Sequence, residues 1–248
     1  MKKYELTNEM KVVFGRTLHR IRALVTFSDV KAGDLGGWIE KEGNLSQEGS
    51  AWVTGFAVVM DSAVVMDSAV VSGSAVVRGS ARVMDSAVVT DEAVVMDSAV
   101  VRDSARVRGS AWVMGSAWVM GSAVVTGSAR VMDLAIVRNS AVVMGSAVVT
   151  GLARVNDSAM ITASARVEKA THYLVIGAIG SRDDATTFFR TKDKQIFVKC
   201  GCFTGSIDKF VKAVKETHGG TKHEKTYLLA VALAKAQIED VEGGEKRE

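Results

Sequence analysis

Apolar and polar residues alternate with a strict period of six over the middle of the chain. From Ala51 to Ala170 the sequence reads as 20 consecutive six-residue units (hexads) without insertion, on the template A-x-V-x-[GD]-S. Alanine occupies the first position of every hexad. Valine occupies the third position of every hexad but one, where Ile161 replaces it. Side chains alternate between the two sides of a strand, so positions one and three share one side and positions two and four the other.

The invariant alanine and valine mark the buried side of these strands, because only close packing restricts side-chain size so strictly. Position two is expected outside, since arginine is almost never fully buried without a partner. The arginines at position two are Arg82, Arg106, Arg130, Arg154 and Arg166. Positions five and six, Gly or Asp followed by Ser, are typical of turns that tolerate a positive φ.

Hexapeptide repeats are typical of a parallel β-helix. The pattern small-x-aliphatic-x-turn-turn resembles the left-handed parallel β-helix, in which three hexads form one triangular coil. That resemblance implies about 18 residues per coil, and the left-handed sense comes from it alone, because crossovers are otherwise right-handed. The expected fold class is therefore mainly β, with residues 51–170 forming the β-helix.

The two flanks of the repeat have a different character. Residues 1–50 are expected to form an N-terminal cap and a first irregular coil, since Leu45 falls six residues before Ala51 and a bare terminal coil would leave strand edges unpaired. Residues 171–248 are expected to form a small α+β domain. Its expected elements are strands at 171–180, 185–191 and 195–203, a hairpin tip at 192–194, a helix from Ser206 to Gly219 and Gly220, and an amphipathic helix at 225–240.

A family resemblance rests on the run "ALVTFSDVKAGDLGGWIEKEGNLSQEG", residues 23–49, followed at once by hexads. Residues 20–55 are similar to the YdcK-like hexapeptide-repeat proteins of bacteria and their phages, and "VKAGDLGGWIE" is the most specific phrase. The segment "IGSRDDATTFF…CGCFTGSIDKF" resembles a C-terminal module of phage-type members. The resemblance implies a fold and a bacterial or phage setting, and it offers no catalytic residues to transfer.

Composition and charge indicate the kind of partner and the cellular compartment to expect. Hydrophobic residues make up 48% and charged residues 24% of the chain, as in soluble globular proteins. A net charge of +3 does not indicate a nucleic-acid or membrane partner. The N-terminus has no apolar signal region, and the two cysteines fit a reducing compartment. We therefore expect a cytoplasmic protein of a bacterial cell, with phage or prophage origin left open.

Enzymatic use of the left-handed β-helix is most often acyl transfer, which requires a histidine general base and loops that build a pocket. The histidines, His19, His172, His218 and His223, all lie outside the hexads, and no loop interrupts the repeat. The sequence therefore predicts no catalysis on the coils and no cofactor. An acyltransferase stays as a residual alternative.

Two weaker candidate binding sites, one for zinc and one for a phosphate group, lie in the C-terminal segment. Cys200 and Cys202, expected on one strand, could form a zinc site with His218 and His223, but the spacing matches zinc sites only loosely. We favour two small buried residues and two exposed histidines. A loop containing Gly180, Ser181, Arg182, Asp183 and Thr186 could hold a phosphate or nucleotide, although it matches no phosphate-binding motif. A polar turn with internal ion pairs is the simpler interpretation.

The outward positions carry the strongest functional signal. Taking every third hexad as one face, two faces are flat ribbons of Val, Met and Trp with scattered arginines, which is typical of an interface. The expected interface residues are Val58, Met60, Val94, Met96, Trp112, Met114, Trp118 and Met120. A partial Thr/Ser ladder on the third face suggests ice binding, but Arg106, Arg108 and Met144 interrupt it.

These observations predict a non-enzymatic structural or interaction protein that forms a homodimer or homotrimer through its apolar outer faces. The main alternative is a phage-type effector or binding module that captures a host or phage protein, or a small phosphorylated ligand.

Overall fold

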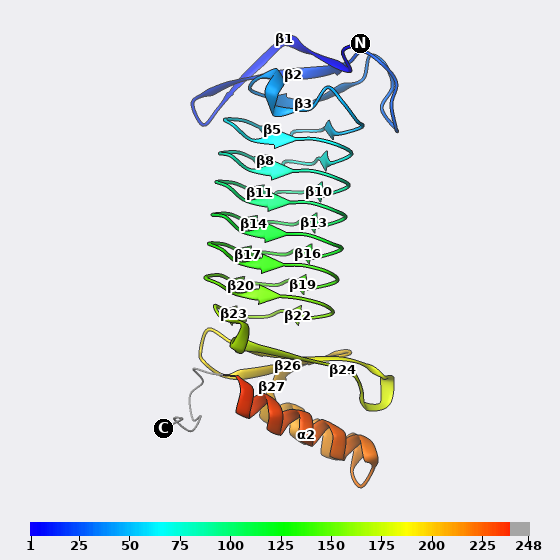
Figure 1. The fold of residues 1–248 in the computed structure, drawn as a ribbon, viewed down its shortest axis with the longest axis vertical. Helices are drawn as coiled ribbons and strands as arrows, with labels where there is room; N and C mark the ends of the chain where they lie inside the picture. The colour runs from blue at the N-terminus through cyan, green and yellow to red at the C-terminus, as the bar shows by residue number, and fades with distance from the viewer. Residues whose placement is uncertain (239–248) are drawn as a thin grey trace.

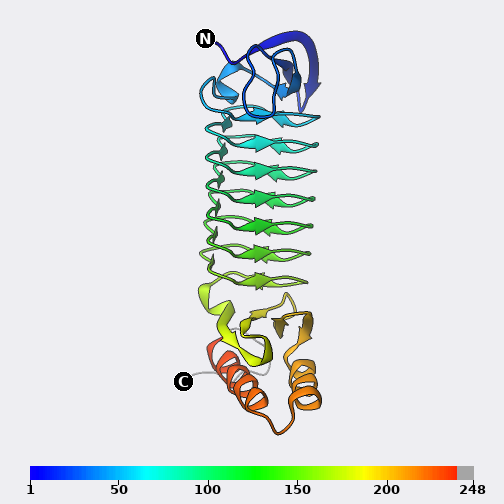
Figure 2. The same cartoon turned by 90° about the vertical axis from the view of Figure 1, so that its right-hand side faces the viewer.

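Stacked parallel β coils form the body of the molecule, between an N-terminal cap and a C-terminal α+β domain (Figures 1 and 2). The computed structural model describes residues 1–238. Each coil strand is two residues long and covers positions two and three of a hexad. The predicted fold class is confirmed: a mainly β protein built on a parallel β-solenoid of about seven coils, with an antiparallel sheet and two helices after it.

The coil strands stack into three sheets, which are the three faces of the prism. Face 1 contains β5 (Val58–Val59), β8 (Val76–Val77), β11 (Val94–Val95), β14 (Trp112–Val113), β17 (Arg130–Val131), β20 (Val148–Val149) and β23 (Arg166–Val167). Face 2 contains β6 (Val64–Val65), β9 (Arg82–Val83), β12 (Val100–Val101), β15 (Trp118–Val119), β18 (Ile136–Val137) and β21 (Arg154–Val155). Face 3 contains β4 (Trp52–Val53), β7 (Val70–Val71), β10 (Val88–Val89), β13 (Arg106–Val107), β16 (Val124–Val125), β19 (Val142–Val143) and β22 (Met160–Ile161).

The pairing register establishes three hexads per coil. Val94 lies beside Trp112 and Val95 beside Val113, so neighbouring strands of a face are one coil of 18 residues apart. Backbone hydrogen bonds join the same neighbouring strands, as in Val94 N–H to Ala111 O at 2.9 Å. The sequence prediction that every third hexad shares a face is confirmed.

A narrow column of alanine and valine fills the prism. From Ala51 to Ala159, the alanine at position one of each hexad has 0% exposure, as do the valines or isoleucine at position three, such as Val101 and Ile161. Because position one contributes only a methyl group, three walls can approach closely around one branched side chain per strand. This packing explains why those two positions hardly vary.

The corners of the prism explain position five. Residues there adopt a positive φ, for example 60° at Asp67 and 67° at Gly73. Glycine takes this conformation freely, and Asp and Asn tolerate it better than other side chains. The aspartates add a second contact: the Asp67 carboxylate accepts the N–H of Asp85, and the Asp85 carboxylate accepts the N–H of Asp103, each at 3.1 Å. Position five therefore connects successive coils as well as turning the chain.

The N-terminal cap extends the sheet of face 1. Its elements are β1 (Tyr4–Val13), β2 (Arg16–Ala23), β3 (Leu35–Ile39) and η1 (Glu42–Asn44). β1 and β2 form an antiparallel hairpin, β2 pairs antiparallel with β3, and β3 pairs parallel with β5. Leu45 forms a parallel bridge to Val65, so the first irregular coil includes Leu45.

Buried polar groups fasten this cap to the first coil. The Tyr4 hydroxyl is 2.8 Å from both Glu42 O and Leu45 O, and burial raises the pKa of this phenol. The Lys3 ammonium donates to Ala51 O at 3.0 Å, and burial lowers the pKa of Lys3 to about 8. The cap therefore satisfies backbone carbonyls that would otherwise lie unpaired at the end of the solenoid.

The C-terminal domain packs two helices on a four-stranded antiparallel sheet of order β24-β25-β26-β27. Its elements are η2 (Ala170–His172), β24 (Tyr173–Ile179), η3 (Gly180–Arg182), β25 (Asp184–Arg190), β26 (Ile196–Cys200), β27 (Phe203–Ser206), α1 (Ile207–His218) and α2 (Lys222–Gln237). The predicted single strand at 195–203 is wrong: the chain reverses at Gly201, whose φ is 52°, and forms two paired strands.

Both helices begin at hydroxyl caps. Ser206, where the sequence predicts the first helix to open, accepts the N–H of Lys209 with its hydroxyl, and the Thr221 hydroxyl accepts the N–H of Glu224. Because Thr221 caps it, α2 begins at Lys222 rather than at residue 225. Residues 239 and 240, the end of the predicted second helix, lie outside the described residues.

The domain covers the last coil through its first strands. Ala165 bridges to Thr191, and the Tyr173 hydroxyl donates to Arg154 O at 2.7 Å. Burial raises the pKa of Tyr173. The Glu168 carboxylate accepts hydrogen bonds from Arg166 and Arg190, and these guanidinium groups hold its pKa below the usual range despite its partial burial. The last coil is therefore closed by backbone and ionic contacts, as the first coil is.

Candidate interaction surface

Position two and position four side chains lie on the outside of the prism, as the arginines predict. Trp112 on face 1 is 40% exposed and Trp118 on face 2 is 38% exposed, in consecutive hexads. The prism presents valine, methionine and tryptophan in columns along both faces, because each strand pairs in register with the next. The two tryptophans are exposed, and the outward valines and methionines of both faces from β8 and β6 onward are half-buried.

The first coil of face 1 is covered by the cap, contrary to the predicted interface. Val58 is 5% exposed and Met60 is 1% exposed. They pack with Leu18 and Trp38 in a small apolar cluster on the outer side of the sheet. Their position in the hexad faces outward, but the hairpin of β1 and β2 folds over them, and nothing in the hexad pattern signals that cover. The available part of face 1 begins at β8.

The arginines on these faces lie along the apolar side chains. The Arg102 guanidinium is 5.3 Å from the Trp118 ring centroid, and it donates to Met120 Sδ at 3.8 Å. Arg130 is 5.9 Å from the ring centroid of Trp112. Cation–π contacts of this kind hold the guanidinium groups beside the indole rings, so the long arginine side chains run along the surface.

Two exposed leucines, missed by the sequence analysis, occupy a corner of the prism. Leu134 is 58% exposed and Leu152 is 71% exposed, and both stand at position six, where serine is usual. They lie in adjacent coils, since Leu134 N–H donates to Gly151 O at 3.1 Å. We call this pair the leucine corner. The departure from serine at two positions 18 residues apart was the signal available in the sequence.

The leucine corner joins face 1 to face 2, because the chain passes from β17 to β18 through Leu134 and from β20 to β21 through Leu152. Beside it, the Asp133 carboxylate accepts hydrogen bonds from the Thr150 hydroxyl and the Gly151 N–H, which lower its pKa. Because Leu134 and Leu152 lie between the strands of face 1 and those of face 2, they connect the methionines of face 1 to Trp118 and Ile136 of face 2 around one edge of the prism.

Face 3 differs from the other two. The Ser72 hydroxyl donates to Thr90 Oγ1 at 2.9 Å, which is the predicted hydroxyl ladder. Arg106 and Arg108 follow as exposed side chains and end it. Face 3 thus offers positions of the same geometry as those on face 1, with a different chemical surface around them.

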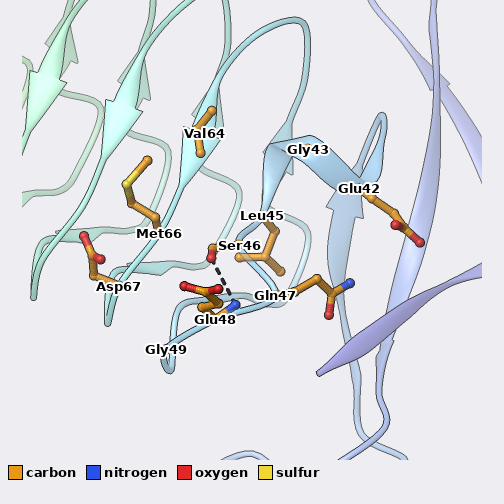
Figure 3. Close-up of a pocket in the computed structure, with 10 residues that line it drawn as sticks. All are labelled: Glu42, Gly43, Leu45, Ser46, Gln47, Glu48, Gly49, Val64, Met66 and Asp67. Carbon is orange, nitrogen blue, oxygen red and sulfur yellow. Dashed lines mark hydrogen bonds between the residues drawn. The ribbon is translucent and has the colours of Figure 1, made fainter. Parts of the chain in front are cut away.

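A shallow depression of about 640 Å³ lies at the start of face 2, where the chain leaves the cap (Figure 3). It is lined by Glu42, Gly43, Leu45, Ser46, Gln47, Glu48, Gly49, Val64, Met66 and Asp67. Glu48 N–H donates to Ser46 Oγ at 3.1 Å, and Gln47 Oε1 accepts the N–H of Lys3 at 2.8 Å. The lining contains the carboxylates of Glu42, Glu48 and Asp67 and the hydroxyl of Ser46.

The residues of the predicted ligand loop lie in different elements, η3 and β25. Gly180, Ser181 and Arg182 form η3, and Asp183 follows with a φ of 49°. A side chain at Gly180 would meet the Tyr227 hydroxyl of α2, so the loop lies directly on the helix. Thr186 is fully buried in β25, where its hydroxyl donates to Cys200 Sγ at 3.3 Å. The loop residues and the Thr186 hydroxyl therefore do not form one phosphate cradle.

The cysteine and histidine candidates are also separated. Cys200 ends β26, whereas Cys202 is exposed in the following turn, so the expectation that they share a strand is wrong. The His218 and His223 rings are 5.8 Å apart near the α1–α2 connection. The Cys200 thiol donates to the Tyr227 hydroxyl at 3.7 Å, and burial raises the pKa of Tyr227. Within residues 1–238, no group of three or more His, Cys, Asp or Glu side chains is placed to hold a metal ion.

The architecture defines the class of protein: a parallel β-solenoid repeat protein with capped ends. The chain matches no known protein-family model and no curated protein. The similarity of residues 20–55 to the YdcK-like proteins, and of the C-terminal segment to a phage module, therefore stays a hypothesis from the sequence. In the described part of the chain, neither helix has both the length and the apolar character needed to cross a membrane.

Proposed function

We propose that this protein is a non-enzymatic structural protein that associates with copies of itself through the outer surface of its solenoid. The contact surface comprises face 1 from β8 onward, the leucine corner and face 2. The observation that carries the proposal is the leucine corner: Leu134 and Leu152 are largely exposed and connect two ribbons of Val, Met and Trp. Exposed leucines at a corner add nothing to the core, so solubility alone would favour the serine found at most corners.

The composition of this surface supports the proposal. Trp, Met and Arg are enriched at the centres of protein interfaces, and Trp and Arg dominate their energetic hot spots. Trp112 and Trp118 stand in consecutive hexads with stacked arginines beside them. The repeat also gives a rigid, flat surface, so association requires little ordering of side chains or backbone.

An arginine placed on this surface is expected to weaken association without disturbing the fold. Val94→Arg adds a charge between Val76 and Trp112 on face 1. Arginine already occupies position two in five hexads, so the solenoid accommodates it. We expect the dissociation constant for self-association to rise at least about thirtyfold, the equivalent of about 2 kcal/mol, in sedimentation velocity.

The matched control is Val142→Arg on face 3, at the same position of its hexad and between Val124 and Met160. It is expected to associate like the wild-type chain. A second variant, Leu134→Ser with Leu152→Ser, restores the usual corner residue and is expected to weaken association with an unchanged melting temperature. Equal association by Val94→Arg and Val142→Arg would show that face 1 is not part of the contact.

A further inference from the structure

The outermost strand of the cap has one edge without a strand partner among residues 1–238. The sheet of face 1 ends in the order β1-β2-β3-β5, and β1 lies at the N-terminal end of the molecule (Figure 1). Met10–Val13 pairs regularly with Arg16–His19 on its inner side, after an irregularity between Leu6 and Met10. The outer edge of this regular segment is therefore a template for another strand.

The exposed side chains of this segment are apolar. Met10 is 58% exposed, Val12 is 71% exposed, and Phe14 at the hairpin tip is 70% exposed. The alternate residues turn toward the molecule: the Lys11 ammonium is 4.5 Å from the Trp38 ring centroid, and Val13 packs against the cluster over the first coil. A strand edge is usually protected by an outward charge or a proline. Within the segment the one charge, on Lys11, is directed inward, the adjacent Glu9 pairs with Arg20 of β2, and the chain contains no proline.

We infer that the strand segment Met10–Val13 forms an antiparallel β pair with the same segment of a second copy, about a two-fold axis at Val12, with Phe14 in the adjoining turn at a φ of 50°. In this register Val12 faces Val12 of the partner subunit, and Met10 faces Phe14 of the partner subunit. Every exposed apolar side chain of the segment then gains an apolar neighbour. A two-fold pair of this kind is the simplest closed assembly.

Other registers of this segment are less favourable. A two-fold axis at Lys11 places two like charges directly opposite one another, which is destabilising. A shift by one residue sets the outward side chains of one strand against the inward side chains of the other. An axis at Met10 leaves Val12 opposite a polar asparagine, so its apolar side chain gains no apolar neighbour.

This contact lies on the cap, and it meets the proposed face surface only at β8, where the Arg78 guanidinium is 5.5 Å from the Phe14 ring centroid. It is a second contact between copies, and it extends the ten-stranded sheet of one molecule into that of the next. Pairing over one short segment buries little area, less than about 1,200 Å², so we expect it to be weak and concentration-dependent.

Disulfide trapping tests the register. In a chain carrying Cys200→Ser and Cys202→Ser, Val12→Cys is expected to form an interchain disulfide under mild oxidation. Directly opposed residues of an antiparallel pair have Cα atoms about 4.5–5.5 Å apart, within disulfide range. The control is Met10→Cys, which the same register holds about 13 Å from its counterpart and which is therefore expected not to cross-link.

A Val12→Cys chain that cross-links no better than Met10→Cys would overturn the proposed pairing, and preferential cross-linking of Met10→Cys would place the axis at Met10 instead. Val12→Lys adds a charge to a side chain that is already exposed, so it is expected to abolish the contact with the melting temperature unchanged. The Val94→Arg variant tests the face association separately. If Val12→Cys fails to cross-link but Val94→Arg still weakens self-association, only the strand pair is contradicted. If Val12→Cys cross-links but Val94→Arg has no effect on self-association, only the face association is contradicted.

Discussion

Replacing Val101 by aspartate is expected to unfold the solenoid, whereas the same replacement at the neighbouring Val100 is expected to leave it folded. Val101 has 0% exposure in the middle of the prism, and Val100 lies on the outer face beside Arg82. A carboxylate in the alanine–valine column has no partner. Burying an unpaired charge costs several kcal/mol, a large part of the stability of an ordinary domain.

The loss of stability caused by Val101→Asp extends beyond the coil that contains residue 101. Each coil contacts only its neighbours, so one disrupted coil separates the cap from the C-terminal half. We expect Val101→Asp to lose its cooperative thermal transition in far-UV circular dichroism, or to lower the stability by more than about 4 kcal/mol. Similar melting curves for Val101→Asp and Val100→Asp would contradict the assignment of inner and outer positions.

Deleting the single residue Ser104 is expected to be more damaging than deleting the whole coil 93–110. The pairing repeats every 18 residues, so removal of 93–110 brings Trp112 beside Val76 with every face in phase. Removal of Ser104 shortens a two-residue corner in which Asp103 has a φ of 59° and Ser104 N–H donates to Gly121 O. Either the corner breaks, or alanine and valine downstream turn outward, because one residue of slip exchanges the two sides of a strand.

Thermal melting and limited proteolysis compare the two deletions. The coil deletion is expected to melt cooperatively and to resist protease like the full chain. The Ser104 deletion is expected to lose cooperative melting and to be cleaved within the repeat. A Ser104 deletion as stable as the coil deletion would show that the corners absorb changes of length, contrary to a fixed pairing register of 18 residues.

The hexads predict the solenoid well because one physical rule acts at every coil. The same packing and turn geometry requires a small residue at position one, a branched residue at position three and Gly or Asp at position five. The pattern therefore repeats often enough to identify the fold from the sequence. The assignment of Trp112 and Trp118 to separate outer faces follows from the same period, and the pairing confirms it.

The sequence predictions differ from the structure where contacts outside the six-residue repeat determine how a residue is placed. Val58 and Met60 have the same hexad positions as exposed residues, but a hairpin from the cap folds over them. The reversal at Gly201 depends on one positive φ in a stretch that otherwise reads as a single strand. Leu134 and Leu152 were visible only as departures from serine, whose meaning depends on knowing that residues 18 apart share a corner.

The central claim, self-association through the solenoid surface, is tested most directly by the molar mass of the Val12→Lys chain in solution. This variant removes the strand pair at the cap and leaves faces 1 and 2 unchanged, so any association reports on the faces alone. Light scattering coupled to size-exclusion chromatography is expected to give a multiple of the 26.4 kDa chain mass, falling toward the single-chain mass on dilution. A mass of 26.4 kDa at every concentration would contradict the claim.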